Sequence, residues 1–179
     1  MIHHIKASEY TEAPWKNGGG LTYEVAADDF QPPSWRVSVA RIDRSGPFSD
    51  FTGYDRTIVA LDGAPVVLNI EGTTIPLEVL VPFSFRGEAS VEASIAGSAR
   101  DLNVMTQRVE WVHDVEVVSG AARFVLDEDE FALVFAAGSV SVEGERLDSG
   151  DTAAIEECES FGVIPDEGAH ACVIRITQA

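Results

Sequence analysis

Hydrophobic and polar residues alternate along much of this 179-residue chain, in short segments separated by glycine, proline, aspartate and serine. Residues 35–41 are the clearest case: Trp35, Val37 and Val39 point to one side, and Arg36 and Ser38 to the other. No segment keeps the 3.6-residue period of an amphipathic helix. The pattern predicts an all-β fold with little helix, whose antiparallel strands close into a sandwich or barrel. We expect strands at residues 21–26, 35–41, 56–61, 64–70, 73–79, 90–95, 102–105, 109–118, 122–126, 130–136, 139–143, 152–157 and 170–177.

Short dipeptides that end in glycine lie between several of these segments and predict tight turns. Dense hairpins of this kind favour a rolled-up sheet over an open one. The dipeptides are Asp62-Gly63, Glu71-Gly72, Glu143-Gly144 and Ser149-Gly150.

The order of segments in residues 57–77 recurs in residues 131–151, where a strand, a turn, a second strand and a short capping strand follow one another again. We infer two similar β modules that arose by duplication. No linker rich in proline or serine divides them, so we expect one packed unit with approximate halves 1–108 and 109–179.

Acidic residues outnumber basic ones by 30 to 12, which gives a formal net charge of −18. Nucleic acid and anionic membrane surfaces would be repelled, so neither is an expected partner. Nine of the 12 basic residues lie within residues 1–110, and the remainder of the chain is strongly acidic. The four consecutive carboxylates at 127–130 are expected to form a solvated turn rather than a cation site.

The first residues lack the apolar stretch of a signal peptide, and no run of about 18 apolar residues occurs. We therefore expect a cytoplasmic protein. Cys158 and Cys172 lie in separate apolar segments without a C-x-x-C spacing, which favours reduced thiols in the core.

Residues 14–20, Pro-Trp-Lys-Asn-Gly-Gly-Gly, place one of the chain's two lysines beside three glycines. The glycine amides could form a concave nest for an anion, with Lys16 as a point charge and Asn17 as a further polar group. Equally, the glycines could serve only a tight turn. The spacing does not fit a nucleotide-binding phosphate loop.

Further candidate anion ligands lie on two of the predicted strands. Arg36 and Ser38 share one strand face and could converge on a planar anion. Arg56 could join them or could instead pair with its neighbour Asp55.

A polar strand and an aromatic loop complete the set of candidates. Asp101 and Asn103 share a strand face opposite Leu102, which indicates either a cavity or an internal pairing of Asp101 with an arginine. The loop at 46–51 presents Ser49 near Phe48, whose ring could equally plug a barrel end.

Histidine residues do not form a metal-binding pattern. His3, His4, His113 and His170 are scattered and no H-x-H pair occurs, so no metal site and no cofactor are expected.

Taken together, the motifs at 14–20, 35–40, 46–56, 85–88 and 101–105 resemble those of the HutD/Ves family, small bacterial bicupin proteins of which HutD is associated with histidine utilisation. The resemblance covers essentially the whole chain and is most specific over residues 14–108. It implies two cupin-like β-barrel or jelly-roll modules, a cytoplasmic location and a pocket in the N-terminal module. It also implies a metal-independent, regulatory or sensing role with a ligand such as formylglutamate, urocanate or formate.

The resemblance also assigns the residues expected to bind a small carboxylate. The chain departs from the family at Tyr23, where relatives commonly carry an arginine, so ligand choice could differ here. The expected ligand-binding residues are Trp15, Lys16, Asn17, Arg36, Ser38, Phe48, Ser49, Arg56, Asp101 and Asn103.

Three functional hypotheses remain open from the sequence. The first is a binding protein for a small carboxylate, for which a homodimer is compatible with the sequence. The second is a metal-free hydrolase or isomerase with Asp101 as general base and Lys16 steadying negative charge. The third is a scaffold whose acidic C-terminal half docks a partner.

Overall fold

The structure, a computed structural model, describes all 179 residues and is built almost entirely of strands. One 3-10 turn, η1 (Ala7–Glu9), is its only helical element, so no helix is long and apolar enough to cross a membrane. The predicted all-β fold is confirmed. The chain divides into two compact units, which we call the pocket module (Thr11–Glu110) and the C-terminal module (Met1–Tyr10 with Trp111–Ala179).

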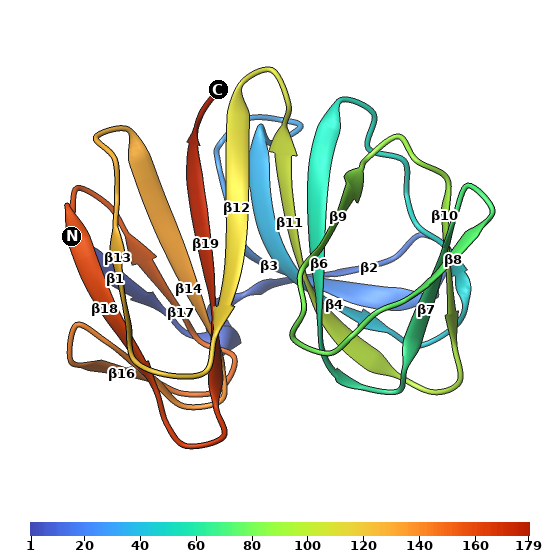
Figure 1. Cartoon of the computed structure of the whole chain (residues 1–179). Helices are drawn as coiled ribbons and strands as arrows, with labels where there is room; N and C mark the ends of the chain where they lie inside the picture. The colour runs from blue at the N-terminus through green and yellow to red at the C-terminus, as the bar shows by residue number, and fades with distance from the viewer. The chain divides into compact units, whose positions relative to one another are not determined.

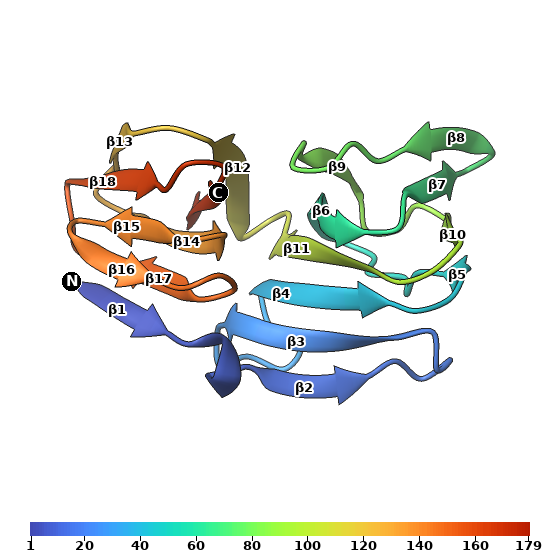
Figure 2. The same cartoon turned by 90° about the horizontal axis from the view of Figure 1, so that it is seen from below.

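The pocket module consists of two antiparallel sheets (Figures 1 and 2). The larger has the order β2-β3-β4-β11-β6-β9 and the smaller β5-β10-β7-β8. The bounds are β2 (Thr11–Pro14), β3 (Gly20–Ala27), β4 (Trp35–Ile42), β5 (Gly46–Pro47), β6 (Tyr54–Gly63), β7 (Val66–Ile70), β8 (Thr73–Pro76), β9 (Phe83–Arg86), β10 (Val91–Ile95) and β11 (Ala99–Gln107).

The C-terminal module also has two sheets, with the orders β1-β17-β14-β19-β12 and β13-β18-β15-β16. The bounds are β1 (Ile2–Ile5), β12 (Trp111–Val118), β13 (Ala122–Val125), β14 (Glu130–Ala137), β15 (Val140–Val142), β16 (Glu145–Leu147), β17 (Thr152–Ile155), β18 (Ser160–Pro165) and β19 (His170–Gln178).

Strand pairing repeats between the two modules. The order β4-β11-β6-β9 in one corresponds to β12-β19-β14-β17 in the other, and β5-β10-β7-β8 corresponds to β13-β18-β15-β16. The two similar modules inferred from residues 57–77 and 131–151 are therefore present, because these stretches form β6–β8 and β14–β16. The boundary differs from the predicted halves, since β1 pairs with β17 and so brings residues 1–10 into the C-terminal module.

Two of the four predicted hairpins are correct and two are wrong. Glu71-Gly72 joins the paired strands β7 and β8, and Glu143-Gly144 joins β15 and β16. At the other two dipeptides, 62–63 and 149–150, the chain passes from one sheet to the other, so the flanking strands are not partners. A glycine turn marks a change of direction but does not determine which strand pairs next.

The sequence pattern did not predict six of the strands, because these strands are short, polar or interrupted. β1, β2 and β16 have three or four residues each, and β5 has two. In β18 a glycine and a proline obscure the alternation, and β9 follows an irregular segment.

Each module has its own hydrophobic core. In the pocket module, buried side chains of β4, β6, β7, β10 and β11 form a cluster that includes Ile42, Ile58 and Leu68. In the C-terminal module the core is larger and is centred on fully buried Phe161 and Ile155. Both cysteines are free, with Cys172 buried and Cys158 only partly so. In the pocket module, polar side chains form part of the interior, among them Ser38, Arg56, Asp101 and Asn103.

Candidate functional site

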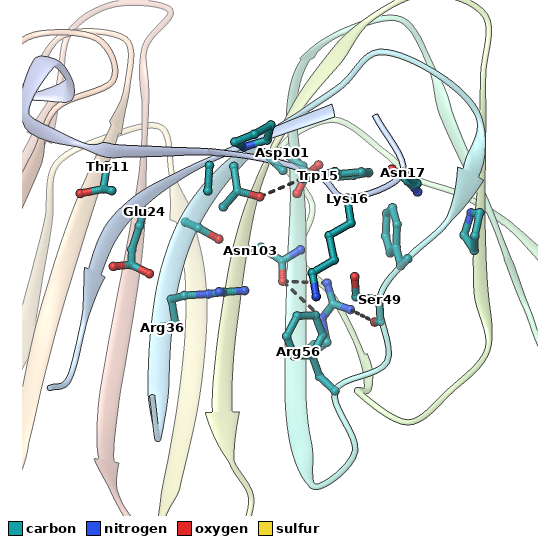
Figure 3. A pocket seen from close by; sticks show the side chains of 18 residues that line it. Thr11, Trp15, Lys16, Asn17, Glu24, Arg36, Ser49, Arg56, Asp101 and Asn103 are labelled. Carbon is teal, nitrogen blue, oxygen red and sulfur yellow. Dashed lines mark hydrogen bonds between the residues drawn. The ribbon is translucent and has the colours of Figure 1, made fainter. Parts of the chain in front are cut away.

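A cavity of about 660 Å³ opens within the pocket module, lined by the inner faces of β3, β4, β6 and β11 and by the chain at 11–17 and 47–51 (Figure 3). This volume lies in the range of about 300–1,000 Å³ that is usual for small-molecule sites. All lining residues belong to the one module, so the site is complete without the other.

Strand register explains how the polar side chains come together. On β4 and β11, Ser38 lies opposite Asn103 and Arg36 lies opposite Met105, while on β6 Arg56 is the second partner of Met105. Directly paired residues share a sheet face, so both arginines point into the same interior. The alternation seen in residues 35–41 therefore becomes one wall of the cavity.

The three cations of the cavity, Lys16, Arg36 and Arg56, have no carboxylate within salt-bridge distance, whereas Arg41 and Arg108 elsewhere in the module are paired with acidic side chains. Figure 3 shows Lys16 extending into the cavity toward Arg56. A cluster of cations without counter-ions attracts an anionic ligand.

Arg56 is the most constrained of these cations, with only 6% of its surface exposed. Its Nε and Nη2 donate to Asn103 Oδ1 at 3.4 and 3.2 Å, and its Nη1 donates to the carbonyl oxygen of Ser49 at 3.5 Å. The ring centroids of Phe48, Phe51 and Phe85 lie 4.9–5.6 Å from the guanidinium carbon. Burial lowers the pKa of Arg56 to about 10, so the group stays charged at neutral pH.

The alternative pairing of Arg56 with Asp55 does not occur. Asp55 points away from the cavity and accepts a hydrogen bond from Arg108 Nε at 2.8 Å. Arg36 likewise has no acidic partner: it lies over the ring of Phe51, and its Nη2 donates only to Met105 Sδ at 3.5 Å. Its Nε is buried and makes no hydrogen bond.

Asp101 is the least expected group in this cationic cavity. It is 1% exposed, and neither carboxyl oxygen has a hydrogen-bond partner. Burial raises its pKa to about 7, an effect that the neighbouring Asn103 amide and the charge of Arg56 only partly oppose. The internal arginine pairing that the sequence left open is therefore absent.

The glycine run forms a turn and does not present a free amide nest. The amide of Gly18 donates to the carbonyl oxygen of Trp15 at 2.9 Å, and that of Gly19 donates to Asn17 Oδ1 at 2.8 Å. Two of the three amides are therefore already used. The turn instead aims the side chain of Lys16 into the cavity (Figure 3).

Gly20 is needed because the backbone of β4 approaches it closely. A Cβ atom at this position would lie 2.2 Å from the carbonyl oxygen of Arg41. We expect Gly20→Ala to lower the free energy of unfolding by about 1 to 3 kcal/mol, as for other overpacked sites, measured by urea denaturation. The matched control is Gly120→Ala, whose added Cβ meets no atom within 4 Å. Equal denaturation midpoints for the two variants would contradict the close approach.

All ten residues predicted to bind a ligand line this one cavity. Trp15 donates its Nε1–H to Thr22 Oγ1 at 2.9 Å, which holds the indole against the wall. The sequence-based set omitted eight lining residues, of which Glu24 is the only charged one; its alternation with Thr22 on β3 could have indicated it. The omitted residues are Thr11, Ala13, Pro14, Thr22, Glu24, Ala40, Pro47 and Phe51.

Tyr23, the position at which the resemblance implied a departure from the family, lies between Thr22 and Glu24 on β3 and does not line the cavity. Neighbouring residues of a strand face opposite sides. A different residue at this position would therefore change the outer face of the sheet and not the cavity wall.

No group of three or more histidine, cysteine, aspartate or glutamate side chains is arranged to hold a metal ion. His4 instead hydrogen-bonds Asp151 in the C-terminal module, with a 2.8 Å distance between Nε2 and Oδ2. The cavity itself contains no histidine or cysteine.

Comparison with known proteins decides the family. The HutD family model matches residues 7–173. The chain belongs to the HutD family. An uncharacterised 21.2 kDa protein from the hutC 3′ region of Pseudomonas putida is 35% identical over 82% of the chain and 81% of its own length. The protein Ves of Citrobacter koseri is 38% identical, over 52% of each chain.

Solved structures of HutD-family and cupin-type proteins share the architecture. HutD from Pseudomonas fluorescens SBW25, solved in a formate condition, is 34% identical with a TM-score of 0.91 over the full length of both chains. A conserved protein of unknown function from Pseudomonas aeruginosa PAO1 is 27% identical with a TM-score of 0.88, again over both full chains. A nickel complex of the bacterial pirin from Escherichia coli, at 11% identity and a TM-score of 0.73 over both full chains, shows the fold alone. The pair of cupin-type modules is thereby confirmed.

Proposed function

We propose that the protein binds a small carboxylate in the cavity of the pocket module and acts as a metal-independent regulatory or sensing component of histidine utilisation in the cytoplasm. The observation that carries the proposal is the set of three cations, Lys16, Arg36 and Arg56, that face one cavity and form no salt bridge, even though Glu24 and Asp101 also line it. Membership of the HutD family supplies the connection with histidine utilisation.

The arrangement suits a carboxylate better than a larger anion. Arg56 is held by Asn103 and by three phenyl rings, so its guanidinium is preorganised for a planar group. Arg36 and Lys16 offer further N–H donors from other walls. The apolar rings of Phe48 and Phe51 would contact the carbon skeleton of the ligand.

A thermal-shift screen tests this function. We expect at least one of formylglutamate, formiminoglutamate, urocanate, histidine, glutamate and formate to raise the melting temperature, because a ligand at about 100 times its dissociation constant adds about 2.7 kcal/mol to the free energy of unfolding. Formamide, which has no charge, serves as the control for formate. A melting temperature unchanged by every compound would overturn the proposal.

A second candidate function is a metal-free hydrolase or isomerase, favoured by one observation. The buried, unpartnered carboxyl of Asp101 has a pKa of about 7, which is the value that suits a general base near neutral pH. Mass spectrometry of the incubated screening mixtures separates the two: new products favour the enzyme, and unchanged compounds that still bind favour the binding protein.

A further inference from the structure

Two carboxyl groups, Glu24 and the fully buried Asp101, line a cavity that also holds three cations, and the proposed function alone does not explain why Asp101 is buried there. The chain has four buried side-chain polar atoms without a hydrogen bond. Three of them, Arg36 Nε and both carboxyl oxygens of Asp101, belong to residues of this cavity; the fourth, Arg175 Nε, lies in the C-terminal module. Unsatisfied buried polar atoms are costly, so their concentration here indicates that a ligand completes them.

Donors dominate the polar groups around the cavity. Asn103 accepts from Arg56 with its Oδ1, so the amide can act on its other neighbours only as a donor, as it does in lowering the pKa of Asp101. Arg36, Arg56 and Lys16 can only donate. A ligand that satisfies these groups must therefore be rich in acceptor oxygens.

Asp101 fits such a ligand in only one protonation state. An ionised carboxylate offers acceptors alone and would repel an anion, whereas the neutral acid offers one O–H donor. Burial of Asp101 already favours the neutral form, and a second negative charge in the cavity favours it further.

Charged side chains from four elements line the cavity together with Asp101, and among them the charge of Arg56 acts on its carboxyl group. β6 contributes Arg56, β4 contributes Arg36, the chain before β3 contributes Lys16, and β3 contributes Glu24. These groups do not pair with Asp101. On β11 itself, Arg100 donates two hydrogen bonds to Asp62 and so is not available to Asp101. All four histidines lie in the C-terminal module, so none of them titrates within this cavity.

We propose that the cavity binds its anionic ligand together with one proton, which Asp101 takes up from solvent and uses to donate an O–H hydrogen bond to a ligand oxygen. The ionised Asp101, one proton and one ligand carboxylate give neutral Asp101 hydrogen-bonded to that carboxylate, so charge and atoms balance. This inference rests on the proposed carboxylate-binding function. It makes Asp101 the residue that selects acceptor-rich ligands and couples their affinity to pH.

Titration calorimetry with formate and with N-formyl-L-glutamate, between pH 6 and 8.5, tests the proposal. Both probes stay ionised throughout this range. We expect an affinity that is constant near pH 6 and falls about tenfold per pH unit above pH 8, because one proton then accompanies each ligand. The binding enthalpy at pH 8 should differ between phosphate and Tris buffers by an amount that corresponds to uptake of nearly one proton.

The variant Asp101→Asn separates proton uptake from any other pH effect. Its amide can donate a hydrogen bond as the neutral acid does, so we expect affinity close to the wild-type value at pH 6, no loss up to pH 8.5 and no buffer dependence. Asp129→Asn, an exposed change in the C-terminal module, should keep the wild-type pH dependence.

The outcomes distinguish this inference from the proposed function. Binding with an affinity that does not change with pH, or that rises with pH, would overturn the inference and leave carboxylate binding in place. The same holds if Asp101→Asn keeps the wild-type slope. Absence of binding by any carboxylate at any pH overturns both. Should Asp101→Asn not fold, the buffer dependence of the wild-type enthalpy decides alone.

Discussion

Arg56→Met is expected to weaken carboxylate binding strongly without unfolding the protein. Arg56 is 6% exposed, and its guanidinium is enclosed by three phenyl rings and forms no salt bridge. Loss of one partner from a buried charge pair costs about 2 to 5 kcal/mol, so the dissociation constant should rise at least about thirtyfold. Calorimetric titration with the compounds that stabilise the wild type measures this change.

The same substitution removes the hydrogen bonds to Asn103 and to the Ser49 carbonyl but also the desolvation cost of a buried cation, so the free energy of unfolding should change by no more than about 1 to 3 kcal/mol. A buried cation without a counter-ion carries a desolvation cost, and an apolar side chain of similar length packs well against Phe48, Phe51 and Phe85. Arg86→Met, at an exposed position of β9, is the matched control and should bind as the wild type does. Unaltered affinity in Arg56→Met would show that Arg56 does not hold the ligand, and a collapse of stability would show that its role is structural.

Asp101→Asn is expected to stabilise the ligand-free protein at alkaline pH and to have little effect at acid pH. The pKa of Asp101 is raised to about 7 in the folded state by burial, against about 3.9 in an unfolded chain. Between these values the folded state binds more protons than the unfolded state. The free energy of unfolding contributed by this group therefore falls as pH rises from about 4 to 7 and stays low above that.

The size of the effect follows from the separation of the two pKa values. About three pKa units correspond to about 4 kcal/mol, which is the most that the substitution can add at pH 8. Urea denaturation of both proteins at pH 5, 6, 7 and 8 measures the difference, and subtracting one curve from the other cancels groups common to both. A difference that does not grow between pH 5 and 8 would contradict a raised pKa for Asp101.

Local alternation allowed much of the cavity wall to be predicted. The side chains of Arg36 and Ser38 had to share a face once residues 35–41 formed a strand, and the same holds for Asp101 and Asn103. The recurrence of one order of strands and turns likewise indicated two similar modules. These features depend on residues close in sequence, where backbone geometry decides the direction of each side chain.

Pairing between distant segments could not be predicted in the same way. β1 joins the C-terminal module through β17, which lies about 150 residues further along the chain, and the turn at 62–63 leads to a different sheet. Either choice satisfies the local pattern equally well, because any strand of suitable length offers the same backbone donors and acceptors.

The sequence by itself determined the strand character of the chain, the shared faces of its polar residues and the scarcity of cations. Only the tertiary structure decided that Asp55 forms an ion pair with Arg108 and that the amides of Gly18 and Gly19 already donate hydrogen bonds. The same holds for the carboxyl oxygens of Asp101, which are buried without a hydrogen-bond partner. The physical reason is that hydrogen bonding and desolvation depend on which distant groups lie within a few ångströms. Residue order alone does not specify that distance.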